Sequence, residues 1–506
     1  MVIFSDELPR FPKEALRDRI VVALCRSRGS GLYRQRARVY EDTDLVICFD
    51  ALSYERLSLL HPLVAQAADL GHAMRIAQRF VQAVQRGARF QAPQLAPLPD
   101  SPDRRVVMLQ TGDFLFGGLE NVIIDLARRL NASGFEAIVG TTGLLSPEGA
   151  RSLADAGLEH VALPPSREQL TQVLRERRVA LVNAHYSIAL AEASHEAGIP
   201  FVQTLHSPYF WLDDAERERW QRADCVTAAY TCVSAIVACF ADLNLGLSPS
   251  KMVVFPNGCH AATAPPSTPE ESARLRAELG IGPDEAVFVN VGSLYPVKGQ
   301  HLLLEAFAEI APECPRCRLV FVGGQLREEC GDRLRAFVTA HGLESQVAFV
   351  GRRGDVHRFL DLATALVMPS FSEGWSLAIS EALRRGTPVV STEVGAAVEQ
   401  LRGTPGILLP AAFDDWRTLT LADFDQALLG NSGVDRVRRA LADALRELAT
   451  MERIPHRPTV GYGCQSPEEA YQRHVALFGH LLAGGAPRDL RWISHLPQRQ
   501  SKYLES

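Results

Sequence analysis

Short runs of apolar residues alternate with segments of helical spacing between residues 105 and 262. The strand-like runs in this part of the chain are RVVMLQT, EAIVGTT, ALVNAHY, IPFVQTLH and KMVVFPNG. Between the first two runs, residues 118–130 repeat apolar side chains every three or four positions, as an amphipathic helix does. Continuous apolar strands separated by helices predict a parallel sheet that is covered on both faces.

The same alternation returns nearer the C-terminus. Its strand-like runs are VFVNVGSL, RLVFVGG, QVAFVGR, ALVMPS, PVVST and GILLP, and most are separated by helical segments such as GQHLLLEAFAEIA. We therefore expect an α/β protein with two doubly wound, Rossmann-like domains in tandem that face a cleft. Ligands of such sheets bind at the carboxyl ends of the strands, so candidate site residues are sought in the loops that follow strands.

Two proline-rich stretches divide the chain. QAPQLAPLPDSPD (residues 91–103) and AATAPPSTPEE (residues 261–271) have the composition of extended linkers between domains. The predicted parts are an appendage at 1–100, Rossmann-like domains at 104–262 and 272–465, a helix at 466–483 and a tail at 484–506.

The appendage is less clearly patterned. RIVVALC and DLVICFD are candidate strands and residues 54–90 look mostly helical, which predicts an α/β or mostly helical structure. Six arginines fall between residues 19 and 38. We interpret them as a solvated face; the alternative is a surface for an anionic partner or a membrane.

Composition narrows the class of protein. Hydrophobic residues make up 47% of the 506, enough for folded domains, and the net charge of −6 argues against a polybasic nucleic-acid binder. The chain has no run of eighteen uncharged apolar residues, and its first twenty residues lack a signal-peptide pattern. We expect a cytoplasmic protein with reduced cysteines, and peripheral attachment to the inner membrane face stays open.

The strongest chemical signal is SFSEGWSLAISEALRRG, which directly follows the run ALVMPS. Ser376 is a predicted N-cap and Gly386 a predicted end of the helix between them. The helix N-terminus offers free backbone N–H groups and partial positive charge, which suits a phosphate. Glu373 before the helix and Glu381 inside it can reach different parts of one extended ligand. Pairing of Glu381 with a neighbouring arginine is the alternative.

Three further motifs follow predicted strands. Lys298 stands at a helix start, where the helix dipole disfavours a cation, so we expect it to face an anionic ligand rather than solvent. Gly117 and Gly118 permit close approach to a ligand, or simply a tight turn. His185 and His206 each end a strand, where imidazole can donate to sugar hydroxyls or phosphate, although a buried histidine is often structural.

Together these motifs resemble retaining glycosyltransferases of family 4, which have the GT-B fold. The resemblance covers about residues 104–483. Its most specific element is Glu-x7-Glu at Glu373 and Glu381, in an EG-aromatic-x-L-x-x-x-E-A context. GGxE at 117–120, TLH ending at His206, PNG at 256–258 and GxLxPxKG around Lys298 occur in the family's order.

The resemblance implies that a nucleotide sugar binds mainly to the second Rossmann-like domain. Glu381 would hold the ribose, Glu373 the hydroxyls of the donor sugar, and Lys298 the diphosphate. The other implied donor contacts are the backbone N–H groups of Gly374, Trp375, Ser376 and Leu377, the loop residue Ser293, and, from the first Rossmann-like domain, Gly118 and His206, the latter near the reacting carbon. It further implies that the C-terminal helix crosses back to the first Rossmann-like domain, that configuration is retained, and that neither a cofactor nor a metal is required.

One departure from the family concerns the diphosphate. Many relatives have an arginine where this chain has Ser293, five residues before Lys298. Charge-assisted contacts contribute about 1.5–3 kcal/mol each, so either donor binding is weaker or another cation replaces the arginine. Arg352 and Arg353 are the candidates because their segment also follows a predicted strand.

Cysteine spacings add no metal site to this interpretation. Cys314 and Cys317 form half a zinc motif, but no second such pair occurs, and we expect them in a surface loop. Cys225, Cys232 and Cys239 recur every seven residues across a predicted change from strand to helix, so we expect small core residues.

We therefore expect a retaining hexosyltransferase that uses a nucleotide-diphosphate sugar. The acceptor would be a growing glycan, as in polysaccharide biosynthesis, a lipid-linked sugar or a small molecule. Two alternatives remain: a nucleotide-sugar epimerase or hydrolase on the same fold, and a non-catalytic partner subunit. The base, the sugar, the acceptor and the role of the appendage are not readable from the sequence.

Overall fold

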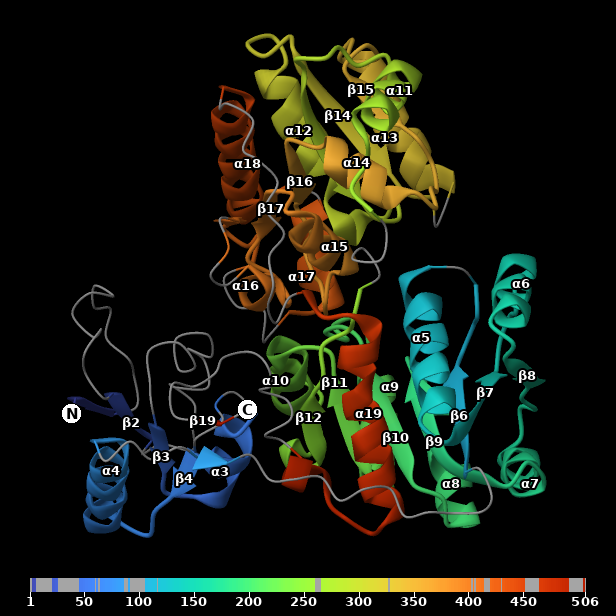
Figure 1. The fold of residues 1–506 in the computed structure, drawn as a ribbon, viewed down its shortest axis with the longest axis vertical. Coiled ribbons are helices and arrows are strands. Elements are labelled where there is room, and N and C mark those ends of the chain that lie inside the picture. The colour runs from blue at the N-terminus through green and yellow to red at the C-terminus, as the bar shows by residue number, and fades with distance from the viewer. Residues whose placement is uncertain are drawn as a thin grey trace. The chain divides into compact units, whose positions relative to one another are not determined.

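The computed structural model describes most of the chain as two compact units (Figure 1). The described residues are 2–5, 21–25, 45–59, 61, 64–85, 90–91, 105–115, 117–259, 265–325, 328–401, 404, 406–413, 419–428, 430–450, 464–490 and 504–505. Unit 1 comprises Met1–His206, Asp213–Pro256 and Glu468–Ser506, and unit 2 comprises Ser207–Leu212 and Asn257–Pro467. Within the described residues, no helix has the length and apolarity needed to cross a bilayer.

A seven-stranded sheet forms the larger part of unit 1, and all of its strands are parallel. In spatial order they are β12 (Met252–Val254), β11 (Ala229–Cys232), β10 (Phe201–Leu205), β9 (Val179–His185), β6 (Arg105–Thr111), β7 (Phe135–Thr141) and β8 (Glu159–Ala162). The parallel sheet expected from the alternating apolar runs is confirmed. The sequence pattern missed β8, because this edge strand buries only Val161 fully and has no apolar run.

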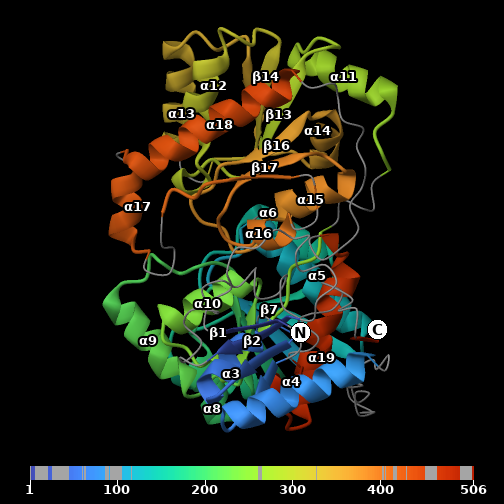
Figure 2. The same cartoon turned by 90° about the vertical axis from the view of Figure 1, so that its left-hand side faces the viewer.

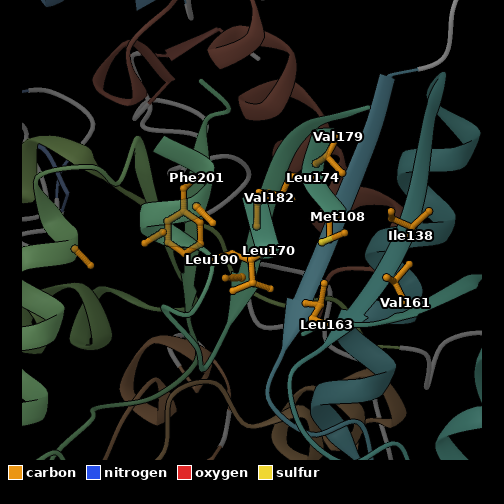
Figure 3. Packing of buried hydrophobic residues seen from close by; sticks show 14 residues of the cluster. Met108, Ile138, Val161, Leu163, Leu170, Leu174, Val179, Val182, Leu190 and Phe201 are labelled. Atoms are coloured by element: carbon orange, nitrogen blue, oxygen red, sulfur yellow. The ribbon is translucent and has the colours of Figure 1, made fainter. Parts of the chain in front are cut away.

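Helices cover this sheet through apolar side chains. They are α5 (Gly118–Ala132), α6 (Pro147–Asp155), α7 (Arg167–Glu176), α8 (Ala191–Ala197), α9 (Asp214–Asp224), α10 (Ala235–Leu243) and α19 (Pro467–Leu482), with the short turns η2 (Pro249–Lys251) and η7 (Pro487–Leu490). On one face, Met108, Val182 and Phe201 from the strands pack with Leu170 and Leu190 from the helical side (Figure 3).

The appendage has a parallel sheet of its own, in the order β1-β2-β3-β4. Its elements are β1 (Val2–Ser5), β2 (Val21–Cys25), β3 (Leu45–Cys48), α3 (Ala51–Leu57), β4 (Val64–Gln66) and α4 (Leu70–Gln85). Two candidate strands are thereby confirmed. The described residues between 54 and 90 are mostly helical, as expected, but the short strand β4, which the sequence pattern did not indicate, lies between α3 and α4. The six arginines at 19–38 lie outside the described residues, so their interpretation stays a prediction.

An ion pair ties the appendage to the larger part of unit 1. Arg56 of α3 donates from Nε to Asp242 of α10 at 2.6 Å and from Nη2 to the second oxygen at 3.0 Å. Both side chains are largely buried. A second, short link pairs β5 (Phe90–Gln91) with β19 (Leu504–Glu505).

Unit 2 contains a six-stranded sheet in the order β15-β14-β13-β16-β17-β18, again fully parallel. Its strands are β13 (Ala286–Val291), β14 (Cys317–Val322), β15 (Val347–Phe349), β16 (Ala365–Met368), β17 (Val389–Thr392) and β18 (Ile407–Leu409). All six were predicted as strand-like runs and are confirmed. Ser207–Leu212 also belongs to this unit, where the Phe210 ring lies 5.6 Å from that of Phe424.

The helices of unit 2 lie between and beside these strands. They are α11 (Pro269–Leu279), α12 (Gln300–Ile310), α13 (Glu328–Ala340), α14 (Val356–Leu362), α15 (Leu377–Arg385), α16 (Ala397–Gln400), α17 (Leu421–Leu428) and α18 (Ser432–Thr450), with the turn η4 (Pro296–Lys298). Helix α18 packs against α12 (Figure 2), and Arg438 pairs there with Glu309 at 2.6 Å.

Two cysteine expectations need correction. Cys317 is the first residue of β14 and is buried, so it does not lie in a surface loop, and burial raises the pKa of its thiol to about 12. Cys232 and Cys239 are buried as expected, whereas Cys225 is exposed.

Candidate functional site

The helix α15 begins immediately after the loop that follows β16. Ser376 caps it, with its Oγ accepting a hydrogen bond from the Ile379 N–H at 3.3 Å, and Gly386 ends it with a left-handed φ of 75°. Both sequence predictions are confirmed. Gln400, at the end of α16, donates from Nε2 to the Ser376 carbonyl at 2.8 Å and to Ser380 Oγ at 2.9 Å. The helix start is thus held by a residue that the sequence analysis missed.

Lys298 and Glu373 form an ion pair beside this helix start. The Lys298 ammonium lies 2.7 Å from Glu373 Oε1, and Ser370 Oγ donates to the same oxygen at 2.8 Å. The Lys298 side chain is 30% exposed and that of Glu373 only 10%. Lys298 is therefore not a solvated surface lysine, and its anionic partner in this structure is a carboxylate of the same unit.

Two glycines allow the loops of this ion pair to approach closely. Gly299, at φ +67°, leaves no room for a side chain, because a Cβ there would lie 2.1 Å from the Pro369 carbonyl oxygen. Gly395, at φ +54°, is equally tight, with 2.0 Å to the Glu373 carbonyl oxygen. A left-handed backbone and a close backbone neighbour together require glycine at both positions.

The loop after β13 carries Ser293. Gln300 donates from Nε2 to the Ser293 carbonyl at 3.0 Å, which holds this loop against the start of α12. The loop after β14 lies directly against it, since a Cβ on Gly323 would be 2.0 Å from the Gly292 oxygen and 3.2 Å from the Ser293 nitrogen. The Arg352 side chain lies over Gly324, whose Cβ position is 3.6 Å from the Arg352 Nε.

Arg353 is held elsewhere. It donates from Nε to Asp355 at 2.8 Å and from Nη1 to Glu278 at 2.7 Å. These hydrogen bonds raise the pKa of Arg353, and those from Arg353 lower the pKa of Asp355. Of the two arginines that could replace the missing cation, Arg352 thus lies over the loop that contacts Ser293, whereas Arg353 is held by Asp355 and Glu278.

Glu381 is half-buried within α15, on the same element as the Ser376 cap. Among its neighbouring arginines, Arg385 has an ion pair with Asp361, from Nε to Oδ1 at 2.7 Å, and Arg384 donates to the Cys464 carbonyl. The assignment of Glu381 to a ribose stays a prediction.

In unit 1, Gly117 caps α5 and Gly118 is exposed as its first residue. The nearby carboxylates serve the backbone. Glu120 Oε1 accepts from the Leu115 N–H at 2.9 Å, and Asp113 Oδ1 accepts from the Leu144 N–H at 2.7 Å. The contact of Gly118 with a donor stays a prediction.

His185 and His206 meet at the carboxyl edge of the seven-stranded sheet. His185 Nδ1 and His206 Nε2 lie 2.8 Å apart, and both rings are buried. Burial lowers the pKa of His206 to about 3 and that of His185 well below its usual value, so both imidazoles are neutral. Tyr186, at φ 54°, stacks on His206 with ring centroids 5.2 Å apart. Nothing in the sequence pattern indicated this left-handed tyrosine.

The predicted donor residues Ser293, Lys298, Glu373, 374–377 and Glu381 all lie in unit 2, whereas Gly118 and His206 lie in unit 1. Sequence comparison covers both units. Residues 271–416 match the family model described as Glycosyl transferases group 1, and residues 116–262 match Glycosyltransferase Family 4. Together the two matches span more than half of the chain.

Relatives and solved structures agree with the family models. A D-inositol 3-phosphate glycosyltransferase from Jonesia denitrificans is 27% identical over 393 residues, which cover 67% of this chain and 91% of that protein. Its counterpart from Frankia alni is 29% identical over 360 residues, covering 60% and 85%.

Solved structures show the same fold at low identity. A glycosyltransferase from Rickettsia africae superposes with a TM-score of 0.57 at 15% identity, covering 75% of this chain and 99% of that one. Anabaena HepE, solved in complex with UDP-glucose, gives 0.54 at 22% identity, covering 68% and 99%. With two doubly wound units, two family models and these relatives, the chain belongs to the GT-B glycosyltransferases of group 1 and family 4.

Proposed function

We propose that this enzyme transfers a hexose-type sugar from a nucleotide-diphosphate donor to an acceptor with retention of configuration. The observation that carries the proposal is the contact of Lys298 with Glu373 at the capped start of α15. Each of these groups in unit 2 matches a part of such a donor. The cation and the helix N-terminus suit the diphosphate, and the carboxylate suits the hydroxyls of the sugar.

The ion pair is suited to exchange of partners. Lys298 is partly exposed, so a diphosphate can replace Glu373 as its anion at little cost in desolvation. Glu373 is then free to accept hydrogen bonds from sugar hydroxyls, while Ser370 keeps its carboxylate in place. The UDP-glucose complex of the structurally similar Anabaena HepE supports a donor of this class.

Charge on the leaving diphosphate is the quantity that this site stabilises. As the bond to the anomeric carbon breaks, negative charge grows on the phosphate, and a preorganised cation and N–H groups lower that barrier. Because these groups supply the positive charge, we propose that transfer needs no dedicated metal. We expect full activity in the presence of EDTA, and a loss of activity there would contradict the proposal.

A front-face mechanism, in which the departing phosphate oxygen takes the acceptor's proton, accounts for retention. Retaining glycosidases instead use a second carboxylate as nucleophile. In the sequence around the loop after β6, the carboxylates are Asp113 and Glu120, and both accept backbone hydrogen bonds, from Leu144 and Leu115. Because these carboxylates already serve the backbone, we favour the front-face mechanism for this enzyme.

For the acceptor, we propose an apolar rather than a phosphorylated face. Leu115, Leu144 and Tyr186 are exposed in the loops after β6, β7 and β9, and Asp113 is the charged residue in the sequence of those loops. A lipid-linked or alkyl-linked sugar suits this edge better than the phosphorylated cyclitol in the relatives' names. Turnover of D-inositol 3-phosphate in preference to an alkyl glycoside would contradict this.

The donor proposal is tested by calorimetric titration of UDP, GDP, ADP and dTDP into wild type and Lys298→Ala. We expect one nucleotide to bind and Lys298→Ala to weaken it at least about tenfold, about 1.4 kcal/mol. Arg438→Ala is the matched control, because Arg438 is also ion-paired in unit 2 but on α18. Equal affinity in wild type and Lys298→Ala would refute the site.

An epimerase or hydrolase remains the rival activity. Incubation with the nucleotide sugar alone separates them, since a transferase leaves most of the sugar unchanged until an acceptor is added. A new sugar or rapid release of nucleotide without acceptor would favour the rival.

A further inference from the structure

Two buried imidazoles meet where neighbouring strands of unit 1 end. His185 is the last residue of β9 and pairs in register with Thr204 of β10, two positions before His206. Their rings are stacked at 5.0 Å between centroids and 25° between planes, and the 2.8 Å separation of His185 Nδ1 and His206 Nε2 is that of a hydrogen bond. Only one of these nitrogens can carry the shared proton.

Both rings are neutral, so each carries a single N–H. His185 is completely buried, and the titratable groups that face it are His206 and, from α19, His474. His474 is itself buried beside Arg473, with a pKa lowered to about 3. Neither of the groups that act on His185 is a carboxylate, so neither favours an imidazolium.

The second nitrogen of His185 decides the direction of the hydrogen bond. His185 Nε2 is buried and has no hydrogen-bond partner among the residues that the structure describes. If His206 donated from Nε2, the proton of His185 would sit on its own Nε2 as a buried N–H without an acceptor. If His185 instead donates from Nδ1, its Nε2 carries no proton and is only an acceptor. Unsatisfied buried acceptors are tolerated more often than N–H donors without an acceptor.

We propose that His185 is a positioning residue that donates from Nδ1 to His206 Nε2 and so fixes His206 as its Nδ1–H tautomer. In that state His206 donates from Nδ1 and has no free basic nitrogen. The consequence for transfer rests on the proposed function. In any step of the proposed transfer, His206 can then act only as a neutral hydrogen-bond donor and not as a general base.

Tyr186 completes the arrangement. Its ring lies on that of His206 at an interplanar angle of 20°, and its backbone has the left-handed φ of 54°, which a bulky residue rarely adopts. The stacking restricts the plane of the His206 ring, and the hydrogen bond from His185 selects which edge of that ring faces His185. Together they define one orientation and one tautomer.

The tautomer is measured directly by nitrogen-15 NMR of the full-length protein labelled at histidine, without ligand. The His206 signals are identified by their loss in His206→Gln. We expect a protonated Nδ1 and a bare Nε2 that do not change between pH 5 and pH 8. A protonated Nε2, or a titration near pH 6.5, would overturn the proposal whatever the enzyme's activity.

Substitution of His185 tests the positioning role. Asn places an amide nitrogen near the position of Nδ1 and can still donate, whereas Leu fills the space without a donor. We expect His185→Leu to lower kcat at least tenfold with the donor KM unchanged, and His185→Asn to stay within threefold of wild type. Equal kcat in wild type and His185→Leu would overturn the catalytic consequence, while the NMR result would still decide the tautomer.

Discussion

The Lys298–Glu373 pair of unit 2 and the His185–His206 pair of unit 1 are both polar contacts shorter than 3 Å, but they are opposite in character. The first consists of two charges with one partner 30% exposed, and the second of two neutral rings, with His185 0% and His206 9% exposed. A charged pair near solvent can exchange one partner for a ligand. A neutral buried pair cannot ionise without a large cost, so it keeps one arrangement throughout the reaction.

The largest expected effect follows from adding a methyl group beside the Lys298–Glu373 ion pair. Gly395→Ala places a methyl group against the Glu373 carbonyl in a left-handed backbone, so we expect kcat/KM to fall about a hundredfold, or about 2.7 kcal/mol. Gly280→Ala is the matched control, because Gly280 has a φ of +64° with nothing within 4 Å of its Cβ position. An equal loss in both variants would show that backbone strain alone is responsible.

The buried histidines make stability depend on pH. His206 and His474 have pKa values lowered to about 3 in the folded protein and ordinary values when unfolded. Their stabilising contribution is therefore present above about pH 6.5 and is lost as the pH falls toward 3. When the pH is lowered from 7.5 to 5.5, we expect each of these two histidines to reduce the free energy of unfolding by about 1.4 kcal/mol.

Urea unfolding at the two pH values checks this expectation, with His206→Gln as the control that should show a smaller change. A midpoint that does not move between pH 7.5 and 5.5 would mean that the pKa values of these rings are not lowered in the folded protein. The contrast with the Lys298–Glu373 pair would then disappear.

Removal of the carboxylate tests the other half of that contrast. In Glu373→Ala the donor sugar loses its hydrogen-bond acceptor and Lys298 its internal partner, so we expect turnover to fall at least about tenfold, or about 1.4 kcal/mol. The nucleotide diphosphate alone should bind at least as tightly as in wild type, because Lys298 no longer has to leave Glu373. Weaker binding of the diphosphate would show that Glu373 holds Lys298 in place rather than competing for it.

The smallest expected effect concerns the second cation. We expect Arg352→Ala to weaken nucleotide diphosphate binding about fivefold, about 1 kcal/mol, because its side chain lies by the loop that contacts Ser293. Arg353→Ala should leave binding unchanged, since Asp355 and Glu278 already hold that arginine. If calorimetry instead showed weaker binding in Arg353→Ala than in Arg352→Ala, Arg353 would be the cation that contacts the diphosphate.

The sequence predicts the local features of the donor site well. Ser376 and Gly386 act on backbone groups within a few residues of themselves, so their roles follow from neighbouring sequence. The bond from Gln400 to Ser376 spans 24 positions, and that from Lys298 to Glu373 spans 75. Contacts of this kind depend on how strands and loops pack, which periodicity does not encode.

The histidines of unit 1 show the same limit. Their placement at the ends of two strands follows from the apolar runs, but the direction of the rings and their hydrogen bond depend on strand register and on burial. The fold of the appendage was partly missed for a related reason. Its fourth strand, β4, has three residues, too few for an alternating pattern to be recognised.

The six residues 207–212 have a consequence for cutting the protein into pieces. They belong to unit 2 although the chain on either side of them belongs to unit 1, and they bring Phe210 to Phe424. A fragment that begins at residue 257 would therefore leave the Phe424 ring without this aromatic neighbour. We expect such a fragment of unit 2 to be less soluble than one to which residues 207–212 are fused.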